Sequence, residues 1–201
     1  MSLHGNNKWS HATVEHRKAM VDHLFDRGLN IPARALTISG EIDEGWFDVL
    51  NAGLSAIELD SPPGEFPAIT LRLFSHGGSP YEALAMLGRL RASPCKIDVQ
   101  VFGCCMSAAT ILLAGASGKR SISEFATFMW HSAKSPIDEE IAPRVMDAAK
   151  QLIREENQWA ELMARFTRQS VKYWQKAYRE RRDDYLTPSQ AVAVGVADEV
   201  F

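Results

Sequence analysis

Gly103-Cys104-Cys105-Met106-Ser107-Ala108-Ala109 is the stretch that decides the fold of this chain. The alternating residues 97–102 before it predict a half-buried strand, and the apolar run 108–114 after it predicts a buried helix. Ser107 is therefore expected on a sharp turn between strand and helix, beside backbone N–H groups that lack intrahelical partners. Such a place favours developing negative charge, as acyl transfer requires, although serine is also common at helix starts simply as a cap.

A second junction of this kind lies upstream, where the apolar run 68–74 leads into Ser75-His76-Gly77-Gly78. Paired glycines let the backbone approach a ligand closely and turn its N–H groups outward. Ser79-Pro80-Tyr81-Glu82 follows and predicts a capping box with proline at the first helical position, which weakens the alternative of a hairpin turn. We expect the two junctions to lie side by side and to offer two donors to one oxyanion.

His131 closes a third apolar run, residues 126–131. A serine hydroxyl is a weak nucleophile unless a nearby base accepts its proton, and a neutral imidazole can do so near pH 7. A single histidine at the end of a strand is more often a structural residue. The pattern alone therefore leaves both roles open for His131.

The remaining chain alternates predicted strands and helices, as α/β packing requires. Arg34 to Ser39 predicts the first strand and residues 40–43 a turn with a helix cap, whereas residues 60–65 read as a surface loop. A helix follows the turn, and its apolar stripe consists of Trp46, Val49, Leu50, Leu54 and Ile57.

Two further helices are expected toward the C-terminus. Residues 141–166 predict one long amphipathic helix. Its apolar stripe has more surface than one face of a sheet would cover. Thr187-Pro188-Ser189-Gln190 caps a short helix that Gly195 ends. The predicted organisation is a polar N-terminal arm, residues 1–33, and a single domain, residues 34–201.

The composition fits a protein with one core in a reducing compartment. The 201 residues are 46% hydrophobic, and a net charge of -3 gives no case for binding nucleic acid or an anionic membrane. Met1 to Met20 lacks an apolar signal core, and no apolar stretch is long enough to span a bilayer. Three cysteines, two of them adjacent, form no disulfide framework or zinc motif, so we expect a cytoplasmic protein without metal or cofactor.

Taken together, these motifs resemble the caseinolytic protease family, ClpP, over about residues 34–201. The motifs that carry the resemblance occur in the family's order and near its spacing. They are Ser75-His76-Gly77-Gly78, Gly103 to Ser107, Ala114 to Arg120, Met129-Trp130-His131, Glu161-Leu162-Met163-Ala164 and Arg182 to Gly195.

The resemblance implies an α/β, ClpP/crotonase-like fold of strand-strand-helix units with a protruding handle helix. It also implies a serine endopeptidase in which Ser107 is the nucleophile, His131 the general base and Asp183 the residue that orients the base. The amides of Gly78 and Ala108 would form the oxyanion hole. Family analogy further suggests peptide or unfolded protein substrates, a seven-membered ring or two stacked rings, and an AAA+ ATPase partner.

The chain departs from the family pattern at several places. His76 replaces a proline, the helix after Ser107 is one residue shorter, and the N-terminal arm lacks an apolar gating sequence. Ser135 to Asp138 predicts another capping box where the family has a glycine-rich strand for substrate binding and ring stacking. We therefore expect an altered contact between rings, which leaves a single ring or a smaller cyclic assembly open.

Other readings remain at this point. The chain could be a catalytically silent assembly subunit, or a crotonase-type acyl-CoA enzyme, which uses similar paired amides. A Ser-Lys peptidase would use Lys150 as its base, Asp184 could replace Asp183, and Cys104 or Cys105 could replace Ser107 as nucleophile. The sequence does not fix the substrate, the use of an ATPase or the ring size.

Overall fold

The computed structural model describes residues 28–132, 142–180 and 182–201, and in these ranges eight strands form one sheet. The strands are β1 (Leu29–Asn30), β2 (Ala35–Ile42), β3 (Ile69–Gly78), β4 (Ile97–Met106), β5 (Arg120–Ile122), β6 (Thr127–Trp130), β7 (Asp184–Leu186) and β8 (Glu199–Val200). The helices are α2 (Trp46–Leu59), α3 (Pro80–Ala92), the 3-10 helix η2 (Ser107–Ala109), α4 (Thr110–Ala114), α5 (Ala142–Phe166), α6 (Val171–Glu180) and α7 (Pro188–Ala193).

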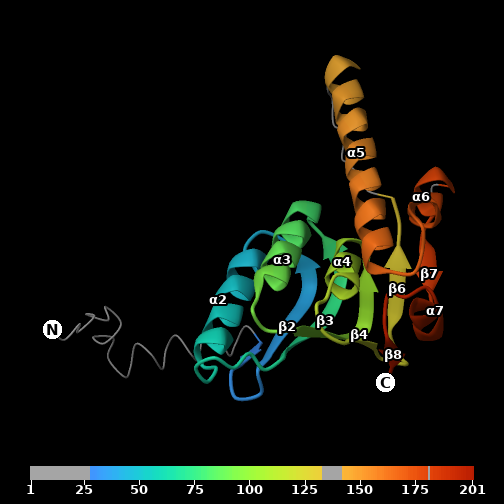
Figure 1. Ribbon diagram of the computed structural model, residues 1–201. Helices are drawn as coiled ribbons and strands as arrows, with labels where there is room; N and C mark the ends of the chain where they lie inside the picture. The colour runs from blue at the N-terminus through green and yellow to red at the C-terminus, as the bar shows by residue number, and fades with distance from the viewer. Residues whose placement is uncertain (1–27, 133–141, 181) are drawn as a thin grey trace.

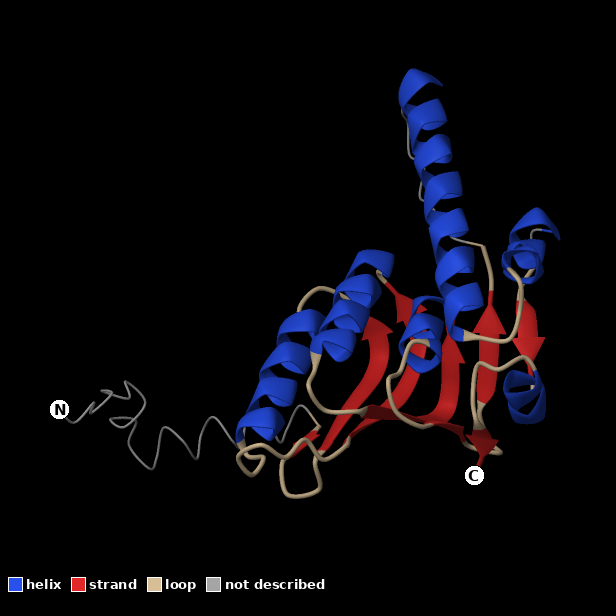
Figure 2. Ribbon diagram, in the orientation of Figure 1, coloured by secondary structure: helices blue, strands red, loops and turns tan. Residues whose placement is uncertain are grey.

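Parallel strands form the centre of the sheet, in the order β2-β3-β4-β5-β8, and β1 adds to one side in the antiparallel direction. Helices α2, α3 and α4 lie on the same face of these strands (Figure 1; Figure 2). Apolar side chains of the strands and of this helix layer form the core, in which Leu54, Leu73 and Ile111 are at most 1% exposed. The predicted α/β packing is confirmed.

Strand β4 has two parallel partners along one side. Residues 99–101 pair with β5, whereas Cys104–Met106 pairs with β6. Carboxyl ends of parallel strands meet at the same edge of a sheet, so the residues that follow β4 and β6 emerge together. Antiparallel β7 then places Asp184 opposite Trp130 in β6. The pairing of β3, β4, β6 and β7 thus brings four segments that are distant in sequence to the carboxyl ends of the parallel strands.

Strands β2 and β3 run further than the sequence indicated. Residues 40–43 were expected to form a turn, but β2 continues to Ile42 because Glu41 and Ile42 pair with Gly77 and Gly78 of β3. The turn prediction was wrong. Helix α2 begins only at Trp46, after Gly45 with a φ of 100°.

The two capping predictions had different outcomes. Thr187 and Gln190 form both halves of a capping box at α7. At α3, Ser79 accepts from the Glu82 amide as predicted, but its own amide donates to the Ile42 carbonyl at 2.6 Å. The Glu82 carboxylate instead accepts from the Phe47 amide at 3.3 Å, and so joins α3 to α2.

Helix α5 is the predicted long helix, and it projects well beyond the sheet as the expected handle does (Figure 1). Its C-terminal part packs into the core through Trp159, Ala160 and Met163, whereas Met146 and Ile153 are 61% and 57% exposed. The predicted capping box at 135–138 lies outside the described residues. So does most of the N-terminal arm, of which Leu29–Asn30 pairs with β2, and the boundary between arm and domain stays a prediction.

Candidate active site

Ser107 lies directly after β4 and opens the 3-10 helix η2, which continues into α4. Its φ is 51°. Among the described non-glycine residues, only Arg34 also has a positive φ. A left-handed conformation typically costs a non-glycine residue about 1–2 kcal/mol. Such strain persists only where the surroundings enforce it, and it is a frequent property of functional residues. The sharp turn expected from the sequence is therefore present.

The two strand-to-helix junctions lie against one another. The parallel register pairs Ser75 with Cys105, so Gly77 comes beside Ser107 two residues later. A Cβ atom at Gly77 would lie 2.6 Å from the Ser107 Cβ and 2.9 Å from the Ala108 amide nitrogen. Only glycine fits this approach, and its φ of 99° also favours glycine.

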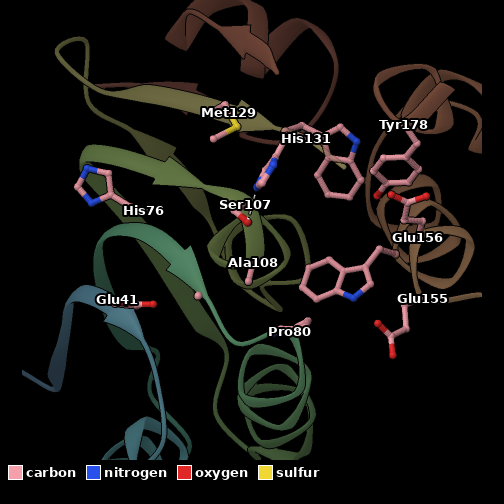
Figure 3. A pocket seen from close by; sticks show the side chains of 13 residues that line it. Glu41, His76, Pro80, Ser107, Ala108, Met129, His131, Glu155, Glu156 and Tyr178 are labelled. Carbon is pink, nitrogen blue, oxygen red and sulfur yellow. Dashed lines mark hydrogen bonds between the residues drawn. The ribbon is translucent and has the colours of Figure 1, made fainter. Parts of the chain in front are cut away.

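The structure brings Ser107 and His131 together. The Ser107 Oγ lies 2.7 Å from Nε2 of His131, whose side chain is only 14% exposed, and Figure 3 shows the two side chains pointing toward one another. This distance is a good hydrogen bond for an O–H donor and an imidazole acceptor. Their proximity follows from the pairing of Met106 with Met129 at the ends of β4 and β6.

Asp183 lies on the other side of the imidazole. Its Oδ1 is 3.9 Å from Nδ1 of His131, longer than a hydrogen bond, and its side chain is 44% exposed. Catalytic hydrogen bonds are often long in structures without substrate. Asp184, the alternative candidate, instead forms an ion pair with Arg182, with 2.7 Å between Asp184 Oδ1 and Arg182 Nε.

A cavity of about 480 Å³ opens beside Ser107. Both proposed oxyanion residues, Gly78 and Ala108, line it together with Ser107 and His131. The other lining residues come from β2, β3, α3, β6, α5 and α6, and Figure 3 labels most of them. They are Glu41, His76, Pro80, Met129, Trp130, Glu155, Glu156, Trp159 and Tyr178.

Most of these lining residues were not predicted as part of a site. Trp159, Glu155 and Glu156 fall within the predicted long helix 141–166, where the sequence gave no signal of a site. Tyr178 lies on α6, whose contact with α5 depends on tertiary packing. Local patterns made Ser107 and His131 candidates but gave no sign of the walls of the cavity.

The structure disfavours the other nucleophiles and the lysine base. Cys104 and Cys105 are buried without a disulfide, and burial raises the pKa of both thiols, which keeps them protonated and unreactive. Lys150 is exposed on α5, with its Nζ 3.3 Å from Asp147, and it does not line the cavity.

Within the described ranges, no three His, Cys, Asp or Glu side chains gather in a way that could hold a metal ion. The described helices include none with the length and apolar character needed to cross a membrane.

A serine within hydrogen-bond distance of a histidine at the carboxyl ends of adjacent strands, beside a glycine-lined turn, is an arrangement that serine-type hydrolases use. Residues 20–201 match the family model for Clp protease, and the chain belongs to this family. It is thus a ClpP-like serine peptidase, as the sequence motifs indicated.

Curated relatives agree with this assignment. The ATP-dependent Clp protease proteolytic subunit 1 of Corynebacterium jeikeium is 27% identical over 193 residues, which cover 96% of each chain. Proteolytic subunit 2 of Streptomyces avermitilis is 30% identical and covers 89% of this chain and 86% of its own. The proteolytic subunit of Dehalococcoides mccartyi strain BAV1 is 27% identical, over 90% and 88% of the two chains. The matches favour a peptidase over an acyl-CoA enzyme.

Proposed function

We propose that this chain hydrolyses peptide bonds with Ser107 as nucleophile and His131 as general base. The observation that carries the proposal is the 2.7 Å separation between Ser107 Oγ and His131 Nε2. His131 would take the hydroxyl proton while Ser107 attacks the carbonyl carbon, and would then give that proton to the leaving amine. Water would hydrolyse the acyl-enzyme by the same steps, with His131 again acting first as base.

Asp183 is the residue proposed to orient the base. A modest shift of its carboxylate toward Nδ1 of His131 would form the hydrogen bond that selects the tautomer and stabilises the imidazolium. Support comes from the pairing of the neighbouring residues Trp130 and Asp184 between β6 and β7, and from the 3.9 Å separation. The ion pair between Asp184 and Arg182 favours a structural role for Asp184.

The amides of Gly78 and Ala108 are proposed to bind the oxyanion of the tetrahedral intermediate. Both residues line the cavity beside Ser107, and Gly77 and Gly78 have positive φ values. Preorganised N–H donors of this kind typically contribute roughly 10²–10³ in rate.

The biological setting is proposed from the family. Relatives are named ATP-dependent proteolytic subunits, so we infer a ring-forming protease in the cytoplasm that acts on peptides or unfolded proteins with a Clp-type ATPase. A catalytically silent assembly subunit is the second candidate, because His76 and the early helix cap depart from the family pattern.

A fluorophosphonate probe separates these two functions. We expect wild-type protein to be labelled and to cleave unstructured peptides, Ser107→Ala to lose both, and His131→Ala to lose cleavage to a similar extent. The double variant should be little worse than either single variant, because the pair acts as a unit. Asp183→Ala should lower cleavage more than Asp184→Ala.

Ser189→Ala, on the exposed surface of α7, is the matched serine control and should leave labelling and cleavage unchanged. Folded wild-type protein that is neither labelled nor active would favour the silent subunit. Retained cleavage in His131→Ala would overturn the proposed base.

A further inference from the structure

The cavity beside Ser107 carries acidic side chains on the walls away from the reacting pair. Glu41, Glu155 and Glu156 line it, and among its described lining residues none is a lysine or an arginine. The α5 glutamates and His76 lie on opposite sides of Ser107 in Figure 3. The lining next to α5 is therefore negatively charged.

Three aromatic side chains also line this cavity. Trp130, Trp159 and Tyr178 come from β6, α5 and α6, and the Trp130 ring lies 6.5 Å from Trp159 and 5.5 Å from Tyr178 between centroids. The Trp130 indole is fixed, because its Nε1 donates to the Trp174 carbonyl at 3.0 Å. Aromatic faces accept both an aliphatic stem and a cation.

The two α5 carboxylates are half-buried and held in place. Glu155 Oε1 accepts from the Tyr81 hydroxyl at 2.6 Å and from Gln151 Nε2 at 2.9 Å. Glu156 lies close to Tyr178, where burial and then the negative charge of Glu156 raise the pKa of the phenol. Tyr178 therefore stays neutral, and its hydroxyl adds no negative charge to this wall.

The position of the cavity indicates which substrate residue would enter it. Gly78 and Ala108, whose amides would hold the carbonyl oxygen during attack, line the same cavity as the two glutamates. The side chain on the Cα bonded to that carbonyl carbon is the substrate group nearest to this space. An apolar side chain would desolvate the carboxylates without compensation, whereas a long cationic one would pack its stem on the rings and pair its charge.

We propose that this cavity selects a lysine or arginine side chain on the residue whose carbonyl Ser107 attacks. The selection rests on the peptidase function proposed above. Glu155 and Glu156 attract the charge, and the three aromatic rings hold the stem.

The test compares fluorogenic peptides that differ only in the residue before the cleaved bond. We expect kcat/KM for arginine to exceed that for citrulline, its neutral isostere, by about tenfold or more, as charge-assisted hydrogen bonds allow. Lysine should likewise exceed norleucine, and both preferences should shrink as salt rises. Glu155→Gln and Glu156→Gln should each lower the arginine-to-citrulline ratio of kcat/KM.

Glu161→Gln is the matched control, because Glu161 is exposed on the same helix and does not line the cavity. Its arginine-to-citrulline ratio should equal that of the wild type. Two results would overturn the proposed selectivity in a protein that still cleaves peptides and still reacts with fluorophosphonate. One is an equal kcat/KM for the arginine and citrulline peptides, and the other is an arginine preference that both glutamine variants retain. Loss of all labelling and cleavage would instead count against the peptidase function itself.

Discussion

At the scale of single residues, the site depends on a close approach between two backbones. Ser107 adopts a left-handed φ of 51°, and Gly77 fits against it with no room for a side chain. The pairing of β3 with β4, which runs from Ile69–Ile97 up to Ser75–Cys105, holds this arrangement in place. We infer that Gly77 positions Ser107, the proposed nucleophile, without itself taking part in the chemistry.

Gly77→Ala tests this role. The new Cβ would meet the Ser107 Cβ and the Met106 and Ala108 backbone, so we expect fluorophosphonate labelling to fall at least about 10²-fold, as misplacement of a reacting group does. Gly40→Ala is the matched control, because Gly40 has a similar φ of 90° but open space around its Cβ position. It should cost about 1 kcal/mol of stability and keep its labelling. Equal labelling in both variants would contradict the positioning role.

The reacting residues were accessible from the sequence for specific reasons. Ser107 and His131 each end an apolar strand pattern, and such ends meet at one edge of a parallel sheet. Asp183 has no local signal, and only the resemblance indicated it; the structure places it near His131 through the β6–β7 register. The triad itself remains a prediction. The aromatic and acidic walls could not be foreseen, because they come from helices whose docking depends on long-range packing.

At the scale of elements, local patterns predicted which segments form strands and helices better than where they end. The extensions of β2 to Ile42 and of β3 to Gly78 support one another through hydrogen bonds between strands distant in sequence. Glycine is unfavourable in a strand, so the local pattern ended the strand at residue 74, before the pair Gly77-Gly78. Tertiary pairing overrode that preference.

Arg120 joins several elements near the C-terminus. Its guanidinium donates to the carbonyls of Phe166 and Gly195 at 3.0 and 2.8 Å, and to the carboxylate of Asp198. It thereby ties β5 to the end of α5 and to the segment that enters β8. The hydrogen bond from Arg120 holds the pKa of Asp198 below its usual value, against the opposing effect of burial.

This pKa shift predicts the pH dependence of stability. A folded-state pKa below the unfolded value, ordinarily about 3.9, adds stability that is present above that value and is lost as pH falls through the folded pKa. Asp198→Asn should therefore lower the unfolding free energy at pH 7, but by no more than about 1 kcal/mol because the side chain is 38% exposed and screened. The difference in unfolding free energy between Asp198→Asn and the wild type should shrink as the pH falls through and below the pKa of Asp198.

Urea denaturation at pH 7 and in acid, at fixed protomer concentration, measures this effect. Asp43→Asn, at an exposed position between β2 and α2, is the control and should match the wild type at both pH values. A pH-independent loss of stability in Asp198→Asn would show that the carboxylate charge is not the cause.

At the scale of the whole molecule, one edge of the sheet carries the site and α5 rises beside it (Figure 1). The C-terminal part of α5 supplies the cavity wall, while its N-terminal part projects with apolar side chains in solvent. Met146 and Ile153 lie seven residues apart, so they share one face of the helix. Helix α5 therefore joins the cavity beside Ser107 to the exposed apolar surface of its projecting part.

We predict that a second copy of the chain covers that surface in a closed cyclic assembly. Each large apolar side chain left exposed forgoes about 1.5–3 kcal/mol, so a monomer is unfavourable, and the family analogy suggests seven subunits per ring. Light scattering of the wild type should give an oligomeric mass, and Met146→Asp with Ile153→Asp should reduce it. Ala148→Asp, on another face of α5, should not. A mass of seven rather than fourteen subunits would support the altered ring contact that Ser135 to Asp138 predicts, whereas a strictly monomeric wild type would contradict the assembly.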